Sequence, residues 1–117
     1  MKILIADKFE KAGVEGLKAT GADVVYEPEA GPTLAQAIER VKPAILIVRS
    51  TKVPGGIIEK AEGLKGIIRA GAGVDNIEVP AATARGIRVC NCAGMNAVAV
   101  AELTFALMLA CDRRIRR

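Results

Sequence analysis

Three short segments carry groups that suit a small acid. Arg49 follows an apolar run, and its planar guanidinium can bind a carboxylate or phosphate through two parallel hydrogen bonds, with the Ser50 hydroxyl as a further donor. The glycines within residues 71–73 let a ligand approach backbone N–H groups closely. Asn96 precedes the last apolar segment, where it can begin a helix whose N-terminus favours an anion. The candidate binding residues are therefore Arg49, Ser50, Gly71, Ala72, Gly73 and Asn96.

Each candidate also has an ordinary structural explanation. Arg49 can be a surface charge at the end of a strand, and the glycines can simply shape a turn. Asn96 suits a helix cap at least as well as a ligand contact. The functional interpretation gains support only if the fold brings the three segments to one place.

Apolar runs rich in β-branched residues alternate with segments at helical spacing. The runs cover residues 2–6, 22–26, 44–49, 64–70 and 87–91, and the helical segments cover residues 8–20, 33–41, 55–62, 79–85 and 97–117. Thr33 is expected to cap the second helix. This alternation predicts one α/β domain over residues 1–117, with a flavodoxin-like, five-stranded parallel sheet in the order 2-1-3-4-5 and helices on both faces.

Ligands of open parallel sheets bind beyond the carboxyl ends of the strands. In the predicted order the third, fourth and fifth strands are neighbours. The segments that follow them, residues 49–51, 71–76 and 91–96, therefore converge on one edge of the sheet. This convergence favours an anion-binding site over three unrelated turns.

The composition excludes several other functions. There is no histidine, which excludes His-based catalytic triads and His metal sites. Aromatic residues make up 3% of the chain, too few for base stacking on single-stranded nucleic acid. The net charge of +4 comes from arginines in the last five residues, which we interpret as a solvated helix end. We expect no nucleic-acid or membrane partner.

The three cysteines and the N-terminal residues suggest a cellular compartment. The chain has an odd number of cysteines, Cys90, Cys92 and Cys111. Met1 leads directly into a strand-like run, with no secretory signal. Reduced thiols in the cytoplasm are the expected state. Cys90 and Cys92 alone are too few ligands for a metal site, so we expect no metal.

Two nucleotide-binding interpretations fail on residue types. Gly71 and Gly73 begin a G-x-G pattern, but Asn76 stands where a dinucleotide fingerprint has its third glycine, and residues 83–91 contain no acidic side chain. Residues 7–9 lack the Ser/Thr-rich phosphate loop that FMN binding needs. The chain itself is therefore not expected to bind NAD or FMN tightly.

Long segments of the chain resemble the D-isomer-specific 2-hydroxyacid dehydrogenase family, and within it the D-3-phosphoglycerate dehydrogenases. These segments are LIVRSTKV (residues 46–53), IIRAGAGVDNIEVPAATARGIRVCN (67–91) and GMNAVAVAELTFALML (94–109). The resemblance implies the substrate-binding domain of an NAD-dependent oxidoreductase of serine biosynthesis, with the chain ending before the Rossmann NAD domain. That second domain supplies the family's catalytic arginine, glutamate and histidine, so we expect no catalytic residue here.

The resemblance also implies roles for individual residues. Arg49 and Ser50 match contacts to the acid groups of a phosphorylated 2-hydroxy acid. The loop at residues 69–73 matches one that lies against the substrate carboxylate and the nicotinamide of NAD, with Ala72 at the cofactor contact. Asn96 matches a substrate-contacting asparagine.

The last apolar segment suggests self-association. Residues 97–111 are apolar nearly all round a helix, and one face of a sheet can cover only one side. We expect the isolated chain to form a homodimer through residues 97–117 and to be inactive alone, with weak substrate binding. The alternative from another class is a non-enzymatic flavodoxin-like module that folds and self-associates.

Overall fold

The structure, a computed structural model, describes residues 2–7, 11–19, 21, 23–30, 33–49, 51–69 and 76–91. The strands are β1 (Lys2–Ile5), β2 (Asp23–Tyr26), β3 (Ile45–Val48), β4 (Gly66–Arg69) and β5 (Arg88–Asn91). The helices are α1 (Lys11–Ala19), α2 (Leu34–Val41), α3 (Gly55–Lys60) and α4 (Val79–Ala84). Strands and helices alternate as the sequence predicts. The expected helix at residues 97–117 lies outside the described residues.

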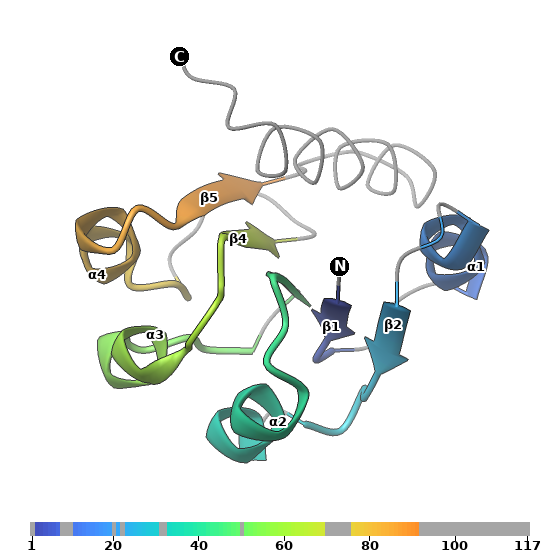
Figure 1. The fold of residues 1–117 in the computed structure, drawn as a ribbon, viewed down its shortest axis with the longest axis horizontal. Coiled ribbons are helices and arrows are strands. Elements are labelled where there is room, and N and C mark those ends of the chain that lie inside the picture. Colours follow the sequence, from blue (N-terminus) through green and yellow to red (C-terminus); the bar gives the residue numbers. More distant parts are fainter. Residues whose placement is uncertain are drawn as a thin grey trace.

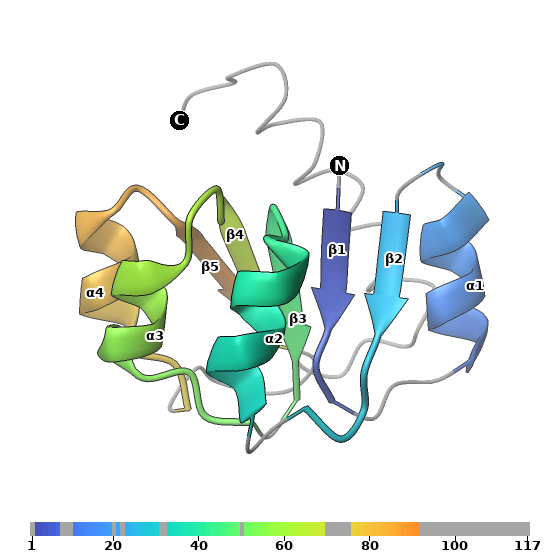
Figure 2. The ribbon, with the colours of Figure 1, turned by 60° about the horizontal axis from the view of Figure 1, so that its bottom comes forward.

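All strand pairs are parallel, and the sheet order is β2-β1-β3-β4-β5, which confirms the predicted fold class. Figure 1 shows α2, α3 and α4 on one face of the sheet and α1 on the other, beside β2. Figure 2 shows the arrowheads of β1, β2 and β3 pointing to the same edge, which we call the carboxyl edge. This topology places the ends of β1, β3 and β4 side by side.

The core consists of branched aliphatic side chains, as the scarcity of aromatic residues requires. Alternate strand residues point to opposite faces of the sheet. Leu4, Leu46 and Ile67 pack with residues of α2, α3 and α4 in one buried cluster. On the other face, Ile5 and Ile47 are at most 1% exposed. Burial on both faces is the environment of a central parallel strand.

The ends of the helices follow the sequence signals with one exception. Gly21 and Gly86 are the second residues after α1 and α4, and they adopt φ of +87° and +72°, a region that glycine enters without steric cost. Thr33 stands at the N-cap position of α2, but its side chain makes no capping hydrogen bond. The prediction of a Thr33 side-chain cap is therefore wrong. Its ψ of 29° differs from the extended backbone that aims a cap oxygen at the first turn.

The segment after β4 supports the rejection of a dinucleotide fingerprint. In such a motif, the glycine-rich turn opens directly into a helix. Here α4 begins at Val79, and Asn76 and Ile77 precede it, with Ile77 in an isolated parallel bridge to Val53. No helix in the described part of the chain has the length and apolarity needed to cross a membrane.

Candidate functional site

The predicted site residues are described only in part. Arg49 is described, and it lies directly after β3 at the carboxyl edge, as predicted. Ser50, Gly71, Ala72, Gly73 and Asn96 lie outside the described residues. The structure therefore tests the location of Arg49 and the arrangement of the groups around it.

Arg49 is exposed, and its backbone is held on both sides. Its N–H donates to Oδ2 of Asp7 at 3.0 Å, and its carbonyl oxygen accepts from Nε of Arg69 at 2.9 Å. These bonds tie the end of β3 to the ends of its two neighbours, β1 and β4. An exposed guanidinium on a fixed backbone is suited to bind a carboxylate or phosphate from solvent.

Arg69 brings a second guanidinium to the carboxyl edge. It is the last residue of β4, and its register partner on β3 is Val48, the residue before Arg49. The bond to the Arg49 carbonyl oxygen uses Nε of the Arg69 guanidinium. The edge therefore has two cationic groups within one short stretch of backbone, which favours an anionic ligand.

Asp7 places a carboxylate at this edge, directly beside the end of β3. Besides Arg49, its Oδ2 atom accepts from the N–H of Thr51 at 2.9 Å, and the Thr51 hydroxyl lies at 2.9 Å from the same oxygen. The Thr51 hydroxyl is also 3.3 Å from the carbonyl oxygen of Ala6. A single carboxylate oxygen thus holds the turn that carries Arg49.

Asn76 connects the same turn to the loop after β4. Its Nδ2 donates to the carbonyl oxygen of Thr51 at 2.6 Å, and its own carbonyl oxygen accepts from the N–H of Val53 at 2.7 Å. Oδ1 of Asn76 is buried and makes no hydrogen bond with the residues that the structure describes. Thr51 is therefore held by Asp7 on its N–H side and by Asn76 on its carbonyl side.

The sequence interpretation assigned no role to Asp7, Thr51 or the Asn76 side chain. Asp7 and Thr51 are separated by 44 residues, and Thr51 and Asn76 by 25. One signal was available, because Asp7 directly follows the β1 run and the predicted strand order places it beside the segment after β3. Asn76 was noted only because it replaces a glycine.

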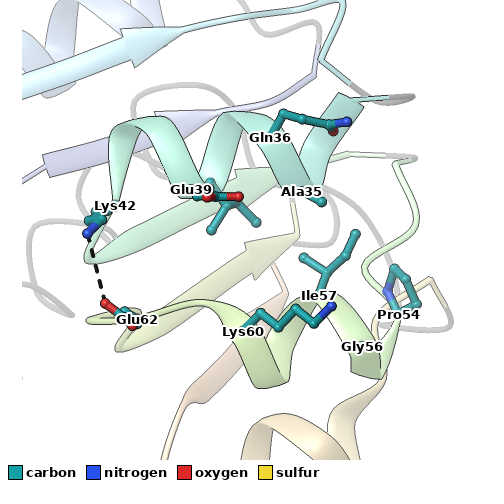
Figure 3. A pocket seen from close by; sticks show the side chains of 10 residues that line it. Ala35, Gln36, Glu39, Lys42, Pro54, Gly56, Ile57, Lys60 and Glu62 are labelled. Carbon is teal, nitrogen blue, oxygen red and sulfur yellow. Dashed lines mark ion pairs between the residues drawn. The ribbon is translucent and has the colours of Figure 1, made fainter.

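A groove of about 670 Å³ lies between α2 and α3, and none of its lining residues takes part in these polar contacts (Figure 3). Its charged lining residues are Glu39, Lys42, Lys60 and Glu62, and Lys42 Nζ lies 3.9 Å from Glu62 Oε2. Charges of both signs are present, and the lining contains no Ser, Thr, Cys or His. Within the described ranges, no three His, Cys, Asp or Glu side chains gather to hold a metal ion. The carboxyl edge is therefore the better candidate for a site.

The chain is similar to curated proteins over nearly its whole length. Curated relatives include the D-3-phosphoglycerate dehydrogenases of Methanocaldococcus jannaschii and Archaeoglobus fulgidus, 46% and 42% identical over 117 residues. Each match covers 98% of this chain and 22% of the relative, so the chain spans about a fifth of the length of these relatives.

Solved structures show the same fold. The PH0520 protein of Pyrococcus horikoshii superposes with a TM-score of 0.71 and 36% identity, over 97% of this chain and 34% of that one. An NAD⁺-bound 3-phosphoglycerate dehydrogenase from Entamoeba histolytica gives a TM-score of 0.65 and 35% identity, over 94% of this chain and 38% of that one.

The family assignment rests on nearly the whole chain. The model of the D-isomer specific 2-hydroxyacid dehydrogenase catalytic domain matches residues 3–116 of 117. The resemblance inferred from the three sequence segments is confirmed. The chain belongs to the D-isomer specific 2-hydroxyacid dehydrogenase family.

Proposed function

We propose that the chain is the substrate-binding domain of an NAD-dependent D-2-hydroxyacid dehydrogenase that oxidises D-3-phosphoglycerate, a reaction of serine biosynthesis. The family membership supports the reaction class, and the D-3-phosphoglycerate dehydrogenases among the relatives support the substrate. The observation that carries the proposal is the position of Arg49, exposed at the carboxyl edge with Arg69 bonded to its carbonyl oxygen. Two guanidinium groups suit a substrate that has both a carboxylate and a phosphate.

In this proposal, Arg49 and Ser50 bind the acid groups of the substrate. Gly71, Ala72 and Gly73 offer backbone N–H groups to the substrate carboxylate, and Asn96 contributes an amide. Substrate binding and orientation are then the tasks of this chain. Proton transfer belongs to the remainder of the subunit, because these 117 residues contain no histidine.

NAD is the cofactor that we propose for the whole subunit. When bound, it accepts the hydride from the carbon that carries the substrate hydroxyl. The described groups at the carboxyl edge include two guanidinium side chains, which suit the acid groups of the substrate that must lie against the nicotinamide. Ala72 is the proposed cofactor contact on this chain. The substrate domain therefore meets NAD at its edge, and we expect no tight NAD binding by this chain alone.

The chain alone should bind the substrate weakly and should not oxidise it. We expect a dissociation constant for D-3-phosphoglycerate of about 1 mM, or roughly 4 kcal/mol of binding free energy. If the purified chain forms NADH from NAD⁺ and D-3-phosphoglycerate, the proposal that it is inactive alone is wrong. A cytoplasmic location and a reduced Cys90 fit this metabolic role.

Two charge variants test the binding proposal. Arg49→Gln removes a cation from the carboxyl edge, and Lys65→Gln removes one before β4, at the opposite edge of the sheet. A lost charge-assisted hydrogen bond costs about 1.5–3 kcal/mol, so Arg49→Gln should weaken binding at least about tenfold. Lys65→Gln should change it less than about twofold. Equal effects of both variants, or no saturable binding by the wild type, would support the non-enzymatic module instead.

Self-association is the last part of the proposal. We propose that the isolated chain forms a homodimer through residues 97–117, because a helix that is apolar on most sides needs a second partner besides the sheet. Light scattering after gel filtration measures the mass directly. A monomer at high concentration would disprove the dimer.

A further inference from the structure

A single carboxylate oxygen organises the turn that carries the candidate anion-binding residues. Oδ2 of Asp7 accepts from the N–H groups of Arg49 and Thr51 at 3.0 and 2.9 Å, and lies 2.9 Å from the Thr51 hydroxyl. Asp7 is on the segment after β1, whereas Arg49 and Thr51 follow β3, the neighbour of β1 in the sheet. The turn thus wraps around an acid of the protein itself.

This arrangement limits how the turn can bind a ligand. The N–H groups of Arg49 and Thr51 are engaged by Asp7, so a bound anion must be held by side chains or by other backbone groups. The carbonyl oxygen of Arg49 is engaged by Arg69, and that of Thr51 by Asn76. Both ends of the turn are therefore fixed, and Arg49, which the turn carries at the carboxyl edge, is exposed.

We propose that Asp7 is a positioning residue of the substrate site: its carboxylate fixes the backbone from Arg49 to Thr51 and thereby aims the Arg49 guanidinium at the acid group of the substrate. This inference rests on the proposed function, since it takes the carboxyl edge as the site of a phosphorylated hydroxy acid. It adds a residue that does not itself contact the ligand.

The sign of the effect separates positioning from simple electrostatics. Asp7 is a negative charge close to a site for an anion. Coulomb's law alone predicts that removing this charge strengthens binding. Positioning predicts that removing the acceptor weakens binding, because the turn loses the bonds that hold Arg49. The two effects have opposite signs at one residue.

Three variants of the full chain distinguish the two effects. Asp7→Ala removes charge and acceptor together, and Asp7→Asn removes the charge but keeps an oxygen at the same reach. Glu15→Ala removes a charge from the exposed side of α1 and serves as the control. Binding of D-3-phosphoglycerate is titrated by NMR, and amide hydrogen exchange is measured at Arg49 and Thr51 without ligand.

Positioning predicts one pattern in both measurements. Asp7→Ala should bind about tenfold more weakly, through the loss of roughly 1.4 kcal/mol, and should lose protection at both amides. Asp7→Asn should stay within about threefold of the wild type, and Glu15→Ala within about twofold. Binding by Asp7→Ala that equals or exceeds wild-type binding would overturn the proposal, and so would equal weakening by Asp7→Ala and Asp7→Asn.

A second pair of variants covers the case in which Asp7→Ala does not fold. Thr51→Val removes one hydroxyl bond to Asp7 in a side chain of nearly the same shape, and Thr51→Ser restores it. Thr51→Val should bind about threefold more weakly, and Thr51→Ser should recover wild-type affinity. Wild-type affinity in Thr51→Val would count against the proposal.

Failure of the proposed function has a separate signature. If the wild type does not bind D-3-phosphoglycerate, the proposed function is overturned by that titration alone. The exchange data then decide the role of Asp7 in the turn. Unchanged protection of the Arg49 and Thr51 amides in Asp7→Ala refutes it, whereas lost protection at these two amides, with the Val53 amide unaffected, supports it.

Discussion

Replacing Arg85 by methionine removes the cation that closes the carboxyl end of α3. Arg85 directly follows α4, and its Nη1 lies 2.6 Å from the carbonyl oxygen of Ile58, 3.0 Å from that of Glu59 and 3.2 Å from that of Ala61. The last four carbonyl groups of a helix have no partner within the helix. The carbonyl oxygens of Ile58 and Ala61 also accept backbone N–H groups, so Arg85 adds a charged donor to the end of a neighbouring helix and joins α3 to α4.

The size of the effect follows from the number of protons on Nη1. This nitrogen has two hydrogens, so it can make two good bonds and share a third. A charged hydrogen bond contributes about 1.5–3 kcal/mol when buried, and Arg85 is exposed, so the estimate must be reduced. We expect Arg85→Met to lower the free energy of unfolding by about 1–1.5 kcal/mol, or about 4–6 °C in Tm for a chain of this size.

Urea denaturation followed by circular dichroism measures this difference. Arg40→Met is the matched control, because Arg40 is also exposed and forms an ion pair with Glu27 on the surface. An exposed pair contributes less than about 0.5 kcal/mol. Arg85→Lys should fall between wild type and Arg85→Met, since it keeps the charge without the planar donors. Equal losses in Arg85→Met and Arg40→Met would refute the capping role.

Three further predictions concern backbone conformation and packing. Gly86→Ala should lower the free energy of unfolding by about 1 kcal/mol. Gly86 has φ of +72°, and a Cβ added there would meet no atom within 4 Å, so the cost is backbone strain alone. Gly56→Ala, in α3 and also without a neighbour within 4 Å, should stabilise by about 0.5–1 kcal/mol; a destabilised Gly56→Ala in thermal melts would contradict this reasoning. Ile67 in β4 is 0% exposed, so Ile67→Ala should lower the free energy of unfolding, measured by denaturant titration, by about 3–4 kcal/mol. A loss under about 1 kcal/mol would show that the core collapses around the gap.

The sheet was predictable because its signals are local and repeated. Each strand is a short apolar run, and the alternation with helices requires parallel pairing. Gly21 and Gly86 ended their helices as expected because only a residue without Cβ enters their φ region cheaply. The Thr33 cap failed because capping depends on ψ as well as on residue type.

The location of Arg49 at the carboxyl edge was predictable, since the end of a strand is visible in the sequence. The contacts that fix Arg49 were not. Oδ2 of Asp7 reaches across 42 residues to the Arg49 amide, and Nδ2 of Asn76 reaches across 25 to Thr51. Such bonds depend on the exact stagger of neighbouring strands, and residue types alone do not specify it. The register of β3 with β4 then brings Arg69 beside Arg49.

The most direct test of the binding site is a map of the amide signals that shift when D-3-phosphoglycerate is titrated into the wild-type chain. We predict saturable shifts at Arg49 and Arg69 and in residues 71–73 and 96, with the α2–α3 groove unaffected. Saturable shifts centred on Lys42 and Lys60, with Arg49 and Arg69 unchanged, would place the anion in the groove and contradict a substrate site at the carboxyl edge.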